Sequence, residues 1–224
     1  MPETSQNPGR KRREPLNAER IAQEAMALVD EAGLDGFSFR NLAARLNCQA
    51  MSLYHYYPSK AHLFEALVGI CISETPIPPE GAPWRARIFD FCASYRQTAL
   101  RHPGFILYFA TFRLNNAAGM AFLEDIVGMM AASGLGGQAL ALHFRAISYY
   151  VTGAAIDEAM GYAKGPSAVD PVAGERARAD FPAITAIGAY FGKDHHRAMF
   201  EHGLNILLDR MEADAASTRS STSR

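Results

Sequence analysis

The feature that most constrains the fold is a stretch between Asp35 and Glu65 that contains no acidic residue. Within it, apolar residues recur at helical spacing in two short segments, and Pro58 ends the second. Two short helices joined by a tight turn are typical of a helix-turn-helix, whose second helix enters the DNA major groove. The same window carries three basic residues, Arg40, Arg45 and Lys60. Because the net charge of the chain is only −1, we expect any contact with a polyanion to come from this local patch.

Capping residues predict where the helices of this region begin. Asn17, Ser38 and Ser59 are suited to N-cap three helices, because a short side-chain oxygen accepts a hydrogen bond from a free backbone N–H. Asn47 tolerates the left-handed backbone conformation that the bend of a helix-turn-helix needs. The helix after that bend is expected over residues 49–56.

The remainder of the chain also indicates helices, so we predict an all-α fold. No segment alternates polar and apolar residues as a strand does, and the proline-rich run 75–83 has the composition of a linker. The expected organisation is an N-terminal three-helix helix-turn-helix domain joined to a larger helical domain that binds an effector and dimerises. The predicted boundaries are a flexible basic arm at 1–13, the helix-turn-helix domain at 14–74, the linker at 75–83, the larger domain at 84–212 and a disordered tail at 213–224.

The larger domain is expected to supply the contact between two copies of the chain. Its predicted helices span residues 84–101, 115–133, 138–163 and 193–213, with a short aromatic segment after residue 104 and a loop over 165–180. The helix from Gln138 and the final helix from Lys193 have apolar faces that suit a four-helix bundle across a two-fold axis. The alternative is that both faces are internal core.

Phosphate contacts are predicted where helices begin, because free N–H groups and basic side chains attract anions there. We assign them to Ser38 and Arg40 at the second helix and to Lys60 at the fourth. The basic run Arg10–Arg13 has two interpretations, a solvated terminus or an arm that lies along DNA.

Sequence reading is assigned to the third helix. Gln49 and Ser52 are placed to hydrogen-bond base edges, and Ala50 or Met51 to contact a thymine methyl group. Tyr57 is predicted to pack in the core. Contacts with the DNA backbone are assigned to Tyr54, His55 and Tyr56.

A small-molecule pocket is predicted where aromatic and polar residues mix on inward-facing helices. The candidate lining residues are Phe105, Tyr108, Phe109, Phe112, His143, Tyr149 and Tyr150. The alternative interpretation of each residue is an ordinary aromatic core.

Catalytic and metal-binding patterns are not found in the sequence. There is no nucleophile elbow, P-loop or Rossmann glycine pattern, so no enzyme and no cofactor are predicted. Three cysteines without C-x-x-C spacing disfavour zinc and fit a reducing compartment. Asp194, His195, His196 and His202 lack H-E-x-x-H spacing, so a solvated face is expected there. No apolar run reaches the roughly 20 residues of a membrane span, and we expect a soluble cytoplasmic protein without membrane contact.

The run LAARLNCQAMSLYHYYPSKAHLFEAL, residues 42–67, resembles the DNA-binding domain of TetR-family transcriptional regulators. Its signature L-Y-x-[HY]-[FVY]-x-[SN]-K is present from Leu53 to Lys60, and AMSLYH is similar to the subgroup nearest the tetracycline repressor. Asn47 departs from the glycine that the family generally has there. The resemblance covers about residues 14–74. It implies a recognition helix at 49–56, a phosphate-binding Lys60, a homodimer, a helical effector domain and repression relieved by a ligand.

The function predicted from the sequence is a homodimeric repressor that a small apolar or amphipathic effector releases from a palindromic double-stranded DNA operator. The alternative is a helical interaction module or a ligand-binding protein that does not bind DNA. Selection of bound sequences from random duplexes separates the two.

Overall fold

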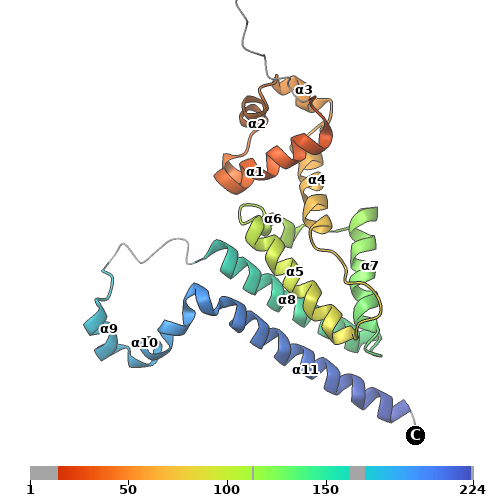
Figure 1. Ribbon diagram of the computed structural model, residues 1–224, viewed down its shortest axis with the longest axis vertical. Helices are drawn as coiled ribbons and strands as arrows, with labels where there is room; N and C mark the ends of the chain where they lie inside the picture. Colours follow the sequence, from red (N-terminus) through yellow and green to blue (C-terminus); the bar gives the residue numbers. More distant parts are fainter. Residues whose placement is uncertain (1–14, 113, 162–169, 223–224) are drawn as a thin grey trace, which may run out of the picture.

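The computed structural model describes residues 15–112, 114–161 and 170–222 of the 224-residue chain. Within these ranges the backbone forms eleven α-helices, two 3-10 helices and no β-strand, so the all-α prediction is confirmed. In Figure 1 a small bundle of α1–α4, here called the head, sits on a larger bundle of α5–α8 and α11, called the body. A segment with α9 and α10, called the arm (residues 170–195), stands out to one side of the body.

The head consists of α1 (Ala18–Gly36), α2 (Phe39–Leu46), α3 (Ala50–Tyr54) and α4 (Lys60–Ser73). The side chains of Asn17, Ser38 and Ser59 each accept a hydrogen bond from the backbone N–H three residues later, as predicted from the sequence. Asn47 has φ 52° and ψ 48°, which confirms the left-handed bend between α2 and α3. The third helix is shorter than the predicted 49–56, because Gln49 is its N-cap and a turn begins at His55.

The body consists of α5 (Trp84–Arg101), α6 (Ile106–Thr111), α7 (Ala117–Ala131), α8 (Gly137–Met160) and α11 (His196–Thr222). The arm contains α9 (Gly174–Asp180), α10 (Pro182–Gly188) and two 3-10 helices (Ala189–Phe191 and Lys193–His195). Part of the predicted 165–180 loop is therefore helical. None of the helices in the described part of the chain combines the length and apolar character that a bilayer crossing requires.

The last helix continues to Thr222 through most of the predicted disordered tail. Ala215 is buried against the body, and Asp214 accepts a hydrogen bond from His143 of α8 at 3.0 Å. Three hydroxyls donate to backbone carbonyls four residues earlier in the helix, those of Ser217, Thr218 and Ser220. Tertiary contacts beyond residue 213 thus extend a helix that composition alone does not predict.

Two apolar clusters form the interior. One fills the head and continues into the body, because the ring of Phe64 on α4 meets Phe105 edge-on at 5.7 Å and Tyr108 at 5.0 Å. The other lies among α5, α7, α8 and α11. There the hydroxyl of Tyr150 donates to backbone carbonyls of α11, directly over Gly203, where an added Cβ would lie 2.2 Å from that oxygen. A side chain at residue 203 would therefore meet the Tyr150 ring where it contacts α11.

Candidate nucleic-acid interface and effector cavity

Helix α3 presents one face to solvent and anchors the other in the head. Leu53 is fully buried, whereas 67% of Met51 is exposed. Gln49 is exposed at the N-cap without a side-chain capping bond, so its amide is available to a ligand. The Tyr54 ring stacks on Phe39 at 4.7 Å, which fixes its position beside the exposed face.

Two further tyrosines tie the end of this helix to the start of α1. The hydroxyl of Tyr56 donates to the Leu16 carbonyl at 2.8 Å, and that of Tyr57 donates to the Ala18 carbonyl at 2.9 Å. The packing role predicted for Tyr57 is confirmed, and the Tyr56 hydroxyl shares that structural role. Of the other predicted contacts in this region, Ala50 and Ser52 are half-buried and His55 is exposed.

The predicted phosphate-contacting residues lie at helix starts. The Ser38 hydroxyl caps α2, and Arg40 is exposed in the first turn of that helix. Lys60 is the first residue of α4, and its Nζ lies 4.9 Å from the Phe64 ring and 5.4 Å from the Phe37 ring. These rings hold the ammonium group near the N-terminus of α4 by cation–π attraction. The predicted basic arm Arg10–Arg13 lies outside the described residues.

Arg45 does not belong to the positive patch that the sequence predicted. Its guanidinium donates to Glu31 at 2.6 Å and to Glu24 at 2.7 Å. The hydrogen bonds that Arg45 donates to Glu31 and to Glu24, the first having the larger effect, raise the pKa of Arg45, and the same pairing lowers the pKa of Glu31. The two carboxylates are seven residues apart on one face of α1, which is the sequence signal that was missed.

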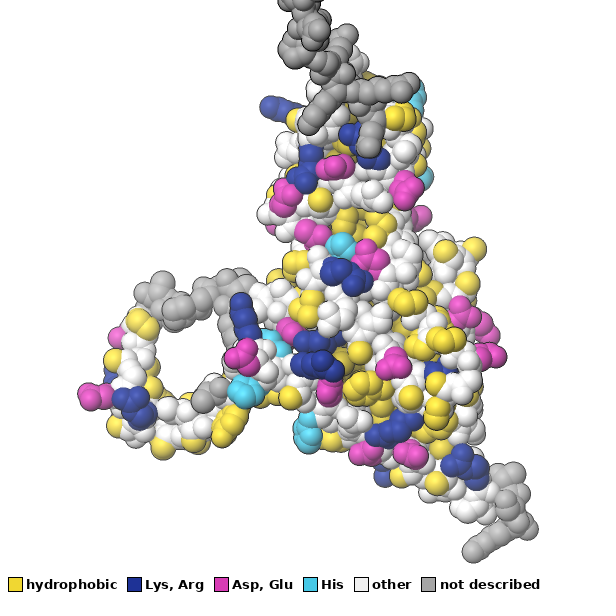
Figure 2. Space-filling view, viewed as in Figure 1, with side chains coloured by type: hydrophobic (Ala, Val, Ile, Leu, Met, Phe, Trp, Pro, Cys, Tyr) yellow, Lys and Arg dark blue, Asp and Glu magenta, His cyan; other side chains and the backbone are white. Residues whose placement is uncertain are grey.

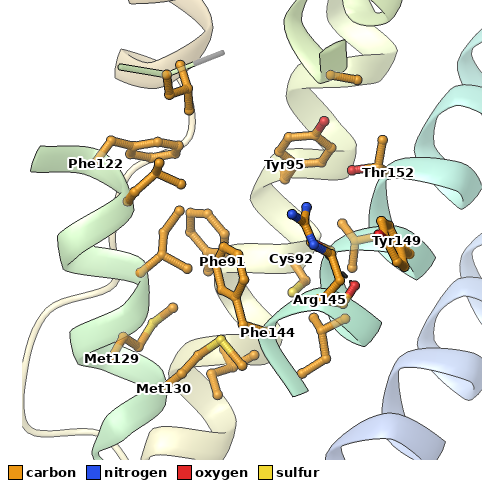
Figure 3. A pocket seen from close by; sticks show the side chains of 18 of the residues that line it. Phe91, Cys92, Tyr95, Phe122, Met129, Met130, Phe144, Arg145, Tyr149 and Thr152 are labelled. Carbon is orange, nitrogen blue, oxygen red and sulfur yellow. Dashed lines mark hydrogen bonds between the residues drawn. The ribbon is translucent and has the colours of Figure 1, made fainter. Parts of the chain in front are cut away.

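The body contains a cavity of about 660 Å³ among α5, α6, α7 and α8. Figure 3 shows its walls, made mainly of apolar side chains, among them Phe91, Phe122, Met129, Met130 and Phe144. Three of the predicted pocket residues, Phe109, Phe112 and Tyr149, line it. From the sequence, the other wall residues could be assigned only to apolar faces of helices. Helical spacing does not distinguish a filled core from one that contains a cavity.

Four predicted pocket residues lie elsewhere, namely Phe105, Tyr108, His143 and Tyr150. The rings of Phe105 and Tyr108 pack on Phe64 in the core of the head. His143 pairs with Asp214, and Tyr150 donates to backbone carbonyls of α11. In this structure these residues face α4 or α11 rather than the cavity.

The cavity is also lined by a few polar groups that were not assigned to a pocket from the sequence. They are Arg145, Ser148 and Thr152 on α8 and Cys92 and Tyr95 on α5. Burial raises the pKa of the Tyr95 phenol, although a hydrogen bond with Thr152 lowers it in part. Burial also raises the pKa of the Cys92 thiol to about 12, so at neutral pH both groups are uncharged.

A polar joint connects the head to the body beside the aromatic contact of α4 and α6. His102, which follows α5, places Nδ1 2.8 Å from Asp30 of α1 and Nε2 3.1 Å from Glu74 after α4. Arg101 donates to the same Glu74 carboxylate at 2.7 Å. The backbone N–H of Gly104 donates to Asp30 at 3.2 Å. The turn between α5 and α6 therefore holds both α1 and α4.

The joint should make stability depend on pH. Burial lowers the pKa of His102, but its hydrogen bonds and charge interactions with Asp30 and Glu74 outweigh burial and raise it above the ordinary 6.5. Because the folded pKa is raised, this contribution is complete below pH 6.5 and is lost as pH rises through the folded value. In urea unfolding at pH 6.0 and 8.5, we expect wild type to lose more stability with rising pH than His102→Gln. Equal losses would contradict the assignment.

The acidic and histidine residues near the end of the arm do not converge. His195 meets the Tyr190 ring at 5.8 Å, and His196 lies 3.8 Å from Glu158. Asp194 and His202 are exposed. Among the described residues no group of three or more His, Cys, Asp or Glu is arranged to hold a metal ion.

Comparisons with known proteins agree with this division into head and body. Residues 21–67 match the family model for bacterial regulatory proteins of the tetR family, and residues 75–215 match the tetracyclin repressor-like C-terminal domain. An HTH-type transcriptional regulator of Saccharopolyspora erythraea is 29% identical over 204 residues, covering 89% of this chain and 86% of that protein. The Escherichia coli tetracycline repressor protein class A from transposon 1721 is 27% identical, covering 87% and 89%.

A solved structure has the same fold over nearly the whole chain. The Streptomyces coelicolor TetR family protein ActR, in complex with actinorhodin, aligns with a TM-score of 0.68 at 25% identity, covering 90% of this chain and 99% of that chain. The two family models together span the head and most of the body. The chain therefore belongs to the TetR family and is a DNA-binding, ligand-responsive transcriptional regulator rather than an enzyme.

Proposed function

We propose that the protein is a homodimeric repressor that a small apolar or amphipathic ligand, bound in the body cavity, releases from a palindromic operator. The observation that carries this proposal is the position of α6. One side of this short helix lines the cavity through Phe109 and Phe112, and the other joins the core of the head through Tyr108. A ligand that displaces α6 therefore acts on α4 without touching it.

The head reads DNA through the exposed face of α3. Gln49 and Ser52 address base edges, and Ala50 and Met51 offer apolar contact with a thymine methyl group. Ser38, Arg40 and Lys60 hold the phosphate backbone from the starts of α2 and α4, which fixes the register without reading sequence. The remaining contacts of this interface are Tyr54, His55 and Tyr56.

Two heads are needed to read a palindrome, and exposed apolar surface supports the dimer that supplies them. Leu142 of α8 and Ile206 of α11 are 64% and 56% exposed on helices that pack against each other. No residue of α9 or α10 is buried, although the arm carries several large apolar side chains. Figure 2 shows hydrophobic side chains on both the arm and the body. Burying such surface against a second copy is the expected driving force.

Release follows from differential binding. The ligand binds more tightly to the arrangement of α6 and α4 in which the two heads are wrongly spaced for the operator. DNA affinity falls by at most the ratio of the ligand's affinities for the two arrangements, which is typically about 5- to 150-fold. The lever is α4, whose Phe64 contacts α6 and whose first residue is the phosphate-contacting Lys60. The ActR protein binds actinorhodin, which is a precedent for a small-molecule ligand in this family.

Selection of bound duplexes from a random library tests the proposal directly. We expect an enriched palindrome with half-sites about one helical turn apart, or a multiple of that spacing. Light scattering without DNA should report twice the mass of one chain. Absence of a palindrome together with a monomeric mass would contradict the proposal.

Gln49→Ala and Lys60→Ala should affect the selected operator in different ways. Gln49→Ala is expected to relax preference at one position of each half-site, where a base contact contributes about 1–3 kcal/mol of discrimination. Lys60→Ala should weaken binding to all duplexes alike and reduce the slope of log affinity against log salt by about 2, since a dimer loses two phosphate contacts. Binding of single-base operator variants at several salt concentrations measures both effects.

Matched controls lie outside the head. Lys193 in the arm and Gln138 in the first turn of α8 are also exposed, and their replacement by alanine should change neither preference nor salt slope. A change of base preference in Lys60→Ala would show that the roles are assigned wrongly.

A further inference from the structure

The charges that face the cavity are unbalanced. Among the described residues, the lining contains one permanently charged side chain, Arg145, and no carboxylate. The Arg145 guanidinium forms no ion pair with any residue that the structure describes. It lies 5.2 Å from the centre of the Tyr149 ring. By contrast, the buried Arg96 of the neighbouring helix is paired with Glu158.

The position of Arg145 suits a ligand contact. Arg145 and Tyr149 are exposed, the latter to 68%, so they form the mouth of a cavity whose far wall is buried. In Figure 3 the guanidinium points toward Tyr95 and Thr152 rather than away from the cavity. A guanidinium in this position recognises a carboxylate or phenolate through charge-assisted hydrogen bonds.

The walls indicate the shape of the rest of the ligand. Aromatic rings from α5, α7 and α8 (Phe91, Phe122 and Phe144) and the side chains of Met129 and Met130 offer flat or adaptable apolar surface. A volume of about 660 Å³ lies within the roughly 300–1,000 Å³ of drug-sized sites. Among the described lining residues, a cationic ligand would meet the guanidinium of Arg145 and no acid.

We propose that Arg145 is the specificity-determining residue of the cavity and that the effector is a flat polycyclic aromatic acid whose anionic group binds this guanidinium. The inference rests on the proposed function for the identity of the cavity as the effector site. The rings fill the space between α5 and α7, and the acid stays at the mouth.

Calorimetric titration of the full chain at pH 7.5, without DNA, tests this assignment with anthraquinone-2-carboxylate and its methyl ester. The two probes share one ring system and differ in charge. Wild type should bind the carboxylate about 10- to 100-fold more tightly than the ester, as expected for a hydrogen bond to a charged group. In Arg145→Gln this ratio should fall to near one with ester affinity unchanged, whereas the exposed Arg197→Gln should keep the wild-type ratio. Melting temperatures confirm that both variants are folded.

Several outcomes would overturn the assignment. These are failure of both probes to bind, equal binding of acid and ester by wild type, and an acid preference that survives in Arg145→Gln. Weaker self-association of Arg145→Gln with an unchanged ratio would instead place Arg145 in the dimer contact and also overturn it. The titration contains no DNA, so it tests the ligand class separately from the proposed function. If the protein bound the acid selectively but the acid did not change operator affinity, the proposed function would be contradicted and the ligand class would stand.

Discussion

Replacing Arg96 with methionine is expected to lower the free energy of unfolding by about 3–5 kcal/mol, the range for breaking a buried ion pair from one side. Arg96 is only 7% exposed, and its guanidinium forms two hydrogen bonds with the carboxylate of Glu158. It also lies 5.6 Å from the ring of Phe200 on α11. The pair thus joins α5 to α8 beneath the start of α11. Since proteins are typically stable by only about 5–15 kcal/mol, this loss is a large fraction of the total.

The size of this effect comes from Glu158, whose largely buried carboxylate would keep only the more distant His196, 3.8 Å away, beside it. Urea unfolding followed by circular dichroism measures the loss. Arg197→Met is the matched control, because its pair with Glu201 on α11 is exposed to 79% and 35%, and solvent screens such pairs so that they add little to stability. The double variant Arg96→Met/Glu158→Leu should recover most of the stability, since two apolar side chains replace both charges. A loss below about 1 kcal/mol in Arg96→Met would show that the pair is not effectively buried.

Local chemistry predicted the head well because each signal acts within a few residues. Three N-caps and the left-handed Asn47 depend on a side chain and the backbone beside it, so they are visible without tertiary structure. The burial of Leu53 follows from helical spacing in a short helix, and Tyr57 packs three residues after the end of that helix.

Contacts between residues far apart in the chain could not be predicted from the sequence. Arg45 is paired with acids 14 and 21 residues earlier, so a window defined by local charge overstated the positive patch. Periodicity identified α6 as aromatic but did not show that one of its sides lines the cavity while the other packs on α4. Phe105 and Tyr108 were therefore assigned to the same pocket as Phe109.

The cavity itself was the hardest feature to anticipate. A hollow arises from how α5, α7 and α8 diverge, and no residue pattern records that divergence. Arg145 is a partial exception, because an arginine between Phe144 and Tyr149 on a mostly apolar helix is a polar group that needs an explanation.

Gly104→Ala is expected to open the joint between head and body and to destabilise the protein by about 1–3 kcal/mol or more, the range for overpacking. An added Cβ would lie 2.2 Å from the Val29 carbonyl oxygen and 2.8 Å from Asp30 Cα. Both obstacles are backbone atoms of α1, so no side-chain rotation relieves the clash. The turn must move away, which breaks the hydrogen bond from Gly104 to Asp30 and strains that of His102 to the same carboxylate.

Gly69→Ala provides a control of opposite sign on the lever helix itself. Gly69 is exposed within α4, and an added Cβ there meets nothing within 4 Å. Alanine should therefore stabilise α4 by about 0.5–1 kcal/mol through helix propensity alone. Urea unfolding measures both variants, and amide hydrogen exchange in the second half of α1 should accelerate only in Gly104→Ala, because that segment loses its contact with the body. If Gly104→Ala were as stable as wild type and protected α1 equally, the turn between α5 and α6 would not hold the head, and α4 alone would have to transmit the ligand signal.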